Sequence, residues 1–158
     1  MTDKASRGQQ GSSGTGHGQH GSSGIGDRRV RVLVVLLRVA GGATASAFLA
    51  IFLPVDWMAA THRWLGLGEF PRAPVVDYLA RSIAALYGFH GVLLLIISGD
   101  PVRYRTIVSY VAVMNIVFGG LVFAIDLNAG LPTAWTVLEG PPIALFGVAM
   151  AYLNRPAR

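Results

Sequence analysis

The sequence has 158 residues, of which 53% are hydrophobic and only 13% are charged. Soluble domains carry about 25% charged residues, so this composition excludes an ordinary soluble fold and predicts a membrane protein. The absence of cysteine excludes a disulfide framework, an iron–sulfur cluster, a thiolate metal site and a cysteine nucleophile. The net charge of +5 comes from basic residues scattered at the ends of apolar runs, a pattern that does not indicate nucleic-acid binding.

Residues 1–29 consist almost entirely of small, polar and charged residues, with GSSG at 11–14 and again at 21–24. Such a segment has too little apolar surface to offset the entropy lost on ordering, so we expect a disordered tail. His17 and His20 lie in it, but two imidazoles on a Gly-rich segment do not make a defined metal site. The remaining residues, 30–154, form the predicted transmembrane domain.

The first predicted span covers residues 32–53 and is interrupted only by Arg38. Its length matches the roughly 20 residues that a helix needs to cross a bilayer. A cleaved signal peptide is the rival interpretation, since three arginines precede the run and residues 43–47 read ATASA. Hydrophobicity continues to Leu53, past any cleavage point, which favours an uncleaved anchor.

Pro54 is expected to end this helix, and residues 56–68 then read DWMAATHRWLGLG. Trp57 and Trp64 fall on one helical face with Met58, Thr61 and Leu65. Tryptophan is enriched at the headgroup level of membranes, so we expect a short interfacial helix anchored by the two tryptophans.

Three further spans are predicted at residues 75–97, 106–125 and 133–153. The third ends at Asp126, and the fourth contains Gly140-Pro141-Pro142, which predicts a kink because two prolines remove two backbone donors. The predicted fold class is therefore an all-α, four-helix transmembrane bundle with an interfacial amphipathic helix in the first loop.

Basic residues indicate the orientation. Five precede the first span, two lie between the second and third spans, and two follow the fourth, whereas the opposite side has only Arg63 and Arg72. Cytoplasmic flanks are enriched in Lys and Arg, so both termini are expected in the cytoplasm and the protein in the cell (inner) membrane of a bacterium.

Four ionisable residues near the outer boundary form a candidate polar pocket. Arg81 lies about 8 Å deep on the second span and Glu139 about 9 Å deep on the fourth, at a rise of 1.5 Å per residue. We expect these two to form an ion pair, with Asp77 one turn from Arg81 and Asp126 at the end of the third span. The pair is interpreted either as a register device or, with the carbonyls freed by the prolines, as a nook for a headgroup, a quinone or a proton.

Three other polar residues fall inside the predicted spans: Arg38, His90 and Asn115. Arg38 is expected to snorkel toward the surface, and Asn115 to form an interhelical hydrogen bond. His90 lies on the opposite helical face from Arg81, and a bis-histidine haem would need a second intramembrane histidine, which the sequence lacks. Small residues at Gly41-Gly42, Gly88, Gly91 and Gly119-Gly120 predict faces for close helix packing.

Short motifs in residues 78–153 resemble the small DoxX-like four-helix membrane proteins and their uncharacterised relatives. They are Arg81 followed by ALYGFHG at 85–91, RYR at 103–105, FGG at 118–120, and GLP at 130–132 followed by Glu139. The resemblance implies a four-helix bundle and, in some relatives, an association with quinone-linked oxidoreductases. Residues 1–74 and the Pro141-Pro142 break lie outside it.

No nucleophile with a paired base can be named, so no catalytic site is predicted. The favoured function is a non-catalytic accessory or assembly partner, in contact with the lipid bilayer and with a membrane protein partner or a second copy, and without a cofactor, a metal or nucleic acid. The alternative is a quinone- or redox-associated subunit that uses the polar pocket. A proton-coupled carrier is disfavoured because no inverted repeat is found.

Overall fold

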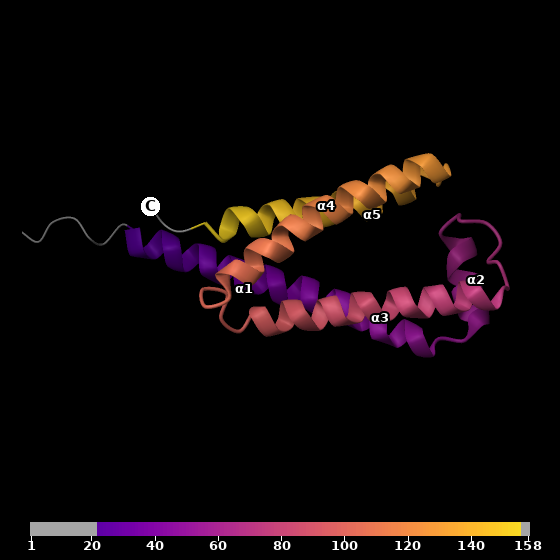
Figure 1. Cartoon of the computed structure of the whole chain (residues 1–158), viewed down its shortest axis with the longest axis horizontal. Coiled ribbons are helices and arrows are strands. Elements are labelled where there is room, and N and C mark those ends of the chain that lie inside the picture. The colour runs from indigo at the N-terminus through magenta and orange to yellow at the C-terminus, as the bar shows by residue number, and fades with distance from the viewer. Residues whose placement is uncertain (1–21, 156–158) are drawn as a thin grey trace, which may run out of the picture.

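The computed structural model describes residues 22–155, and every regular element in this range is a helix (Figure 1). The elements are α1 (Ser22–Ala45), the 3₁₀ helix η1 (Ser46–Phe52), α2 (Val55–Trp64), α3 (Pro74–Ile97), α4 (Arg105–Ala129) and α5 (Thr133–Leu153). Within the described residues, four helical segments are long and apolar enough to cross a membrane. The predicted four-helix class is confirmed, and the chain is a multi-pass membrane protein.

The first span consists of α1 and η1, which together form an apolar helical segment from Gly26 to Phe52. Because α1 begins at Ser22, the prediction of disorder was wrong for residues 22–29. Extending a helix from an apolar span adds a hydrogen bond for each residue fixed, and the Arg29 guanidinium stacks over the Tyr152 ring at 5.4 Å from its centroid. The rest of the predicted tail, including His17 and His20, lies outside the described residues.

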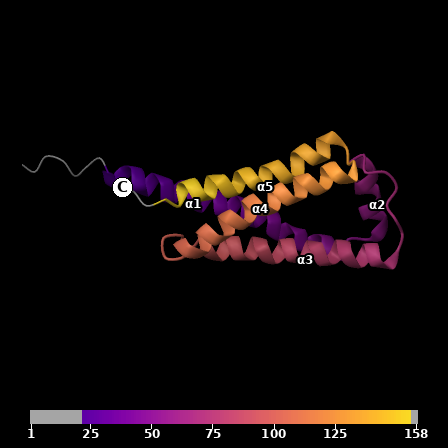
Figure 2. The same ribbon diagram turned by 45° about the horizontal axis from the view of Figure 1, so that its top comes forward.

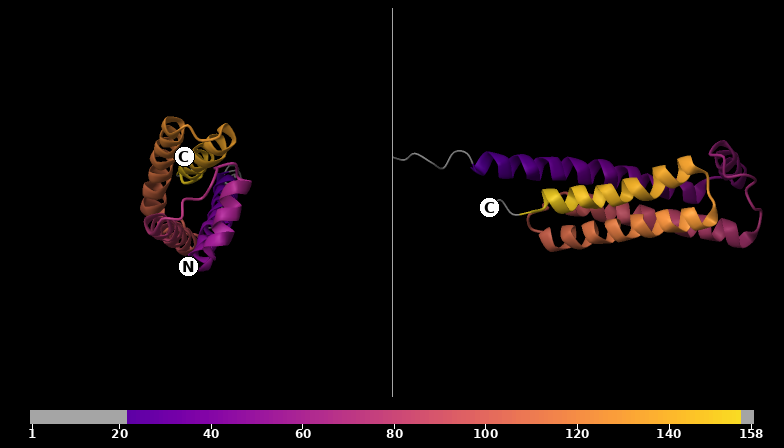
Figure 3. Two further views of the ribbon diagram at one scale, coloured as in Figure 1. Left: turned by 90° about the vertical axis from the view of Figure 1, so that its right-hand side faces the viewer. Right: turned by 90° about the horizontal axis from the view of Figure 1, so that it is seen from above.

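The predicted helix after Pro54 is confirmed as α2, which lies across one end of the bundle (Figure 1). Leu53 has an extended backbone, with φ −67° and ψ 136°, so the chain turns sharply between η1 and α2. The expected anchors Trp57 and Trp64 are 67% and 83% exposed. We call this end of the molecule the α2 end. The opposite end, where α1 begins and α5 ends, is the terminal end (Figure 3).

The third span is longer than expected, because α4 continues past Asp126 to Ala129. Gly130 then adopts φ +67°, a left-handed conformation that glycine enters without strain. The Leu131 N–H donates to the Asp126 carbonyl and the Gly130 N–H to that of Leu127, which is the Schellman arrangement of a helix end. Asp126 therefore lies in the last turn of α4 instead of capping it.

The fourth span matches its predicted bounds, and α5 continues through Pro141 and Pro142 as one helix. The two prolines thus do not divide the span into two helical elements, and the kink expected at them stays a prediction. Gly140, directly before the prolines, packs against α4, where a methyl group on it would lie 2.6 Å from the Gly119 carbonyl oxygen. This close contact holds α5 against α4 at the level of the prolines.

Glycines set the two closest helix pairings. One pair is α1 with η1 against α3: a methyl group at Gly91 would lie 2.2 Å from the Ala45 nitrogen. The other is α4 against α5: a methyl group at Gly119 would lie 2.5 Å from the Ala144 nitrogen. The small-residue faces predicted at Gly41, Gly88, Gly91 and Gly119 are confirmed, whereas Gly42 and Gly120 face open space. Dispersion contacts between close backbones are a main source of helix association in lipid.

A single hydrophobic core joins the two pairs, and it lies at the terminal end. Its buried residues come from all four spans: Leu33, Leu37, Leu94, Ile97, Val108, Val111, Ala112 and Met150. They occupy the first half of the first span, the last turns of α3 and α5 and the first turns of α4, so the core does not extend to the α2 end. From this core the pairs diverge toward the α2 end (Figures 1 and 2).

Candidate functional site

The Arg81 side chain on α3 is held by its own helix and by the end of η1. Its Nε donates to both carboxylate oxygens of Asp77, at 2.9 and 3.0 Å. Its two terminal nitrogens donate to the main-chain carbonyls of Ile51 and of Leu53, the latter at 3.2 Å. The last carbonyls of a helix have no partner within it, so the guanidinium satisfies groups that would otherwise be unpaired in the membrane.

The expected ion pair between Arg81 and Glu139 is not formed. Arg81 is in the pair made by η1 and α3, and its ion-pair partner is Asp77. Glu139 is in the other pair, where it lies near Asp126 of α4 and beside Trp135, one turn earlier on α5. The two residues have similar depths, but they belong to helix pairs that diverge at this end (Figure 2). The predicted pocket therefore divides into a neutralised Arg81–Asp77 group and an acidic Asp126–Glu139 group.

Asp126 is the most buried ionisable residue of the predicted pocket, with 4% of its surface exposed. Its Oδ2 atom is buried and has no hydrogen-bond partner within the described residues. Glu139 is only partly buried and extends the acidic group toward the surface of α5. No ion pair formed within residues 22–155 includes either carboxylate.

The other polar residues predicted inside the membrane are Asn115, Arg38 and His90. Asn115 is buried, but its Nδ2 donates to the Val111 carbonyl of the same helix at 2.8 Å. The expected interhelical bond of Asn115 was therefore wrong, because an amide side chain reaches the carbonyl four residues earlier without any neighbour. Arg38 is exposed, and His90 is partly buried on α3. No group of three or more metal-ligating side chains occurs in the described part of the chain.

Comparison with family models, with curated proteins and with solved structures finds no match to this chain. The resemblance to DoxX-like proteins therefore stays an expectation from the sequence motifs.

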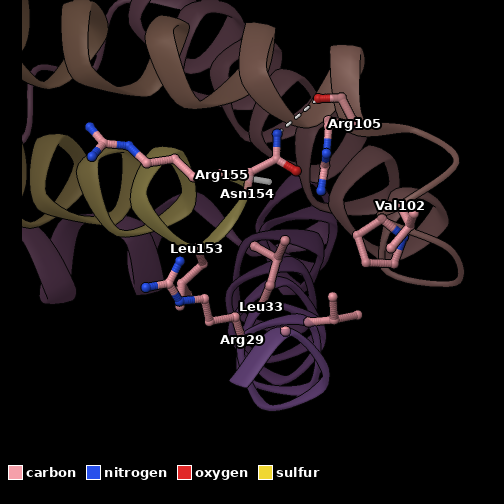
Figure 4. Close-up of a pocket in the computed structure, with 10 residues that line it drawn as sticks. Arg29, Leu33, Val102, Arg105, Leu153, Asn154 and Arg155 are labelled. Carbon is pink, nitrogen blue, oxygen red and sulfur yellow. Dashed lines mark hydrogen bonds between the residues drawn. The ribbon is translucent and has the colours of Figure 1, made fainter. Parts of the chain in front are cut away.

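A pocket of about 120 Å³ at the terminal end was not predicted (Figure 4). Three arginines line it: Arg29 from α1, Arg105 from the start of α4, and Arg155 just after α5. Asn154 holds the end of α5 against α4 there, since its Nδ2 donates to the Arg105 carbonyl and to the Ser109 hydroxyl, both at 2.9 Å. The sequence did place all three arginines beside apolar spans on the same side of the membrane. They were interpreted only as charges that set the orientation, so no site was predicted from them.

Proposed function

We propose that this protein acts without chemistry of its own, as an accessory or assembly partner of another protein in the cell membrane. The observation that carries the proposal is one face of α5. Trp135, Glu139, Pro142, Phe146 and Leu153 recur at spacings of three, four and seven residues, so they lie along one side of the helix.

This face, which we call the inner face of α5, has two different halves. Toward the terminal end, Phe146 and Leu153 pack against the shared core. Toward the α2 end, Trp135, Glu139 and Pro142 continue the same face beyond that core. The opposite side of α5 carries Val137 and Val148, which are 52% and 51% exposed and suit contact with lipid. The inner face thus extends past the part of the bundle that covers it.

Charge indicates what covers the remaining half. An ionised carboxylate inside a membrane costs on the order of 2.5–3.5 kcal/mol unless it has a partner. Arg81 is engaged by Asp77, and Arg38 lies in the half of the first span nearer the terminal end. Residues 22–155 of a second copy therefore offer no free cation at this depth. A transmembrane helix of another protein, with a basic or amide side chain at the level of Glu139, would satisfy the acidic group.

The test is site-specific photocrosslinking in membranes of the native host. A photoreactive amino acid replaces Trp135 on the inner face or Val137 on the lipid-facing side, with the rest of the chain intact. Position 135 is expected to yield a discrete adduct with one other membrane protein, and position 137 is the matched control at a nearby depth. When Glu139→Gln is combined with the photoreactive residue at position 135, the adduct yield should fall, because the attraction to the partner's polar group is weakened.

Four outcomes would contradict the proposal. No protein adduct at position 135, or equal adducts at both positions, would show that the inner face is not an interface. An adduct twice the mass of the chain would indicate a homo-oligomer. An adduct with a quinone, identified by mass spectrometry, would favour the alternative redox-associated subunit.

A further inference from the structure

The arginine-lined pocket at the terminal end has features of a binding site that the proposed function does not use. Its three arginines come from segments far apart in the sequence, and all three lie at one boundary of the apolar spans. In Figure 4, Arg105 lies on one side of Asn154, and Arg29 and Arg155 lie on the other. The fold therefore brings these three charges to one end of the bundle, although they are spread over more than 120 positions of the sequence.

The charges around this pocket are not neutralised by the described chain. No acidic residue lines the pocket, and none of the three arginines takes part in an ion pair formed within residues 22–155. The Arg105 Nε is buried without a hydrogen-bond partner in that range. Arg29 and Arg155 both stack on the Tyr152 ring, at 5.4 and 5.9 Å from its centroid, so two like charges lie against one aromatic ring. An anion bound between these groups would relieve their repulsion and supply the missing acceptor.

The rest of the lining indicates the source of the anion. Val30, Leu33, Pro101, Val102 and Leu153 provide an apolar wall beside the guanidinium groups. A free phosphate ion has no apolar part to place against such a wall, whereas a phospholipid has a charged phosphate next to its glycerol and acyl chains. Arginine recognises phosphate through paired N–H groups, and basic pockets between membrane helices bind anionic headgroups.

We propose that the pocket formed by Arg29, Arg105 and Arg155 binds the headgroup of an anionic phospholipid. A phosphate lies against Arg105, and Arg29 and Arg155 hold a second anionic group or the other side of the same phosphate. The acyl chains follow the apolar wall into the bilayer. The bound lipid bridges α1, α4 and the end of α5, next to the core that joins the two helix pairs.

The test is lipid binding to the full chain, purified in a neutral detergent and measured by native mass spectrometry. Cardiolipin and phosphatidylglycerol are titrated as anionic probes, phosphatidylcholine as the neutral lipid, and inorganic phosphate as the free ion. At least one anionic lipid is expected to bind about tenfold or more tightly than phosphatidylcholine, as charge-assisted contacts imply. Inorganic phosphate at the same concentrations is expected neither to bind nor to displace that lipid.

Variants separate the pocket from general surface charge. Arg105→Gln, and the double change Arg29→Gln with Arg155→Gln, should each weaken binding of the anionic lipid about tenfold or more. The matched control is Arg103→Gln, which removes the same charge from an exposed residue outside the pocket. It should cost no more than the roughly fivefold expected from long-range attraction to one arginine.

Equal losses in Arg103→Gln and in the pocket variants would overturn the proposal, because binding would then follow net charge alone. Equal binding of anionic and neutral lipids, or competition by inorganic phosphate, would also overturn it. If Arg105→Gln does not fold, the double variant of Arg29 and Arg155 and the variant Arg105→Lys still test whether the pocket binds the lipid. The lysine keeps the charge but loses the planar fork, so it should retain only part of the affinity.

Discussion

The contacts of Arg81 lead to a quantitative prediction about stability. Arg81→Gln removes the charge-assisted bond to Asp77 and leaves the carbonyls of Ile51 and Leu53 without their donor. The two carbonyl bonds contribute about 1 kcal/mol each. The ion pair contributes about 1 kcal/mol, since its side chains are 30% and 36% exposed and hydrogen bonds between membrane helices reach at most about 1.7 kcal/mol in double-mutant cycles. The expected loss in the free energy of unfolding is therefore about 3 kcal/mol.

A double-mutant cycle measures which carboxylate Arg81 interacts with. Unfolding by sodium dodecyl sulfate in mixed micelles gives the free energy of unfolding for Arg81→Gln, Asp77→Asn and the double variant. The coupling energy between residues 81 and 77 should be about 1 kcal/mol. The same cycle with Glu139→Gln is the control, and its coupling should stay within about 0.5 kcal/mol of zero, as for residues that do not touch. A larger coupling with Glu139 than with Asp77 would refute the arrangement described here.

Two further predictions concern the contacts between α4 and α5. Gly119→Ala should destabilise the protein by about 1–3 kcal/mol, because the new methyl group overpacks against the α5 backbone. The methyl group of Gly120→Ala meets open space, so this variant should be neutral or stabilising by up to about 1 kcal/mol. The same unfolding assay compares the two variants, and equal effects would contradict the pairing of α4 with α5. Asn154→Ala should cost about 1–3 kcal/mol through the lost bonds to Arg105 and Ser109, and an unchanged unfolding midpoint would show that these bonds do not hold α5 to α4.

The sequence predicted the spans well, because a bilayer requires long apolar helices and their ends are marked by proline, glycine and charge. The segment at 133–153 agrees with α5 at both ends. The predicted ends were less accurate where polar residues continue a helix beyond the apolar run. This was so before the first span, at residues 22–29, and for the last turn of α4, which ends only where Gly130 turns left-handed.

The polar contacts were predicted less well, because depth along a helix does not determine which helix lies beside it. Arg81 and Glu139 have similar depths, yet the glycine contacts place them in different helix pairs. Asn115 had an acceptor on its own helix, which sequence spacing makes as available as one on a neighbour. The arginine pocket depends on three segments meeting at one end, and no local pattern in the sequence encodes that meeting.

The central prediction, that the four spans cross the membrane with both termini in the cytoplasm, is tested most directly by cysteine accessibility. The chain has no cysteine, so single cysteines can be introduced at Glu69 and Asn128 on the α2 end and at Arg103 on the terminal end, with a fourth added after Arg158. A membrane-impermeant maleimide applied to intact cells should label the cysteines at 69 and 128, and should label the other two only after the cells are opened. Labelling of either terminal-end cysteine in intact cells, or protection of either α2-end cysteine, would contradict this topology.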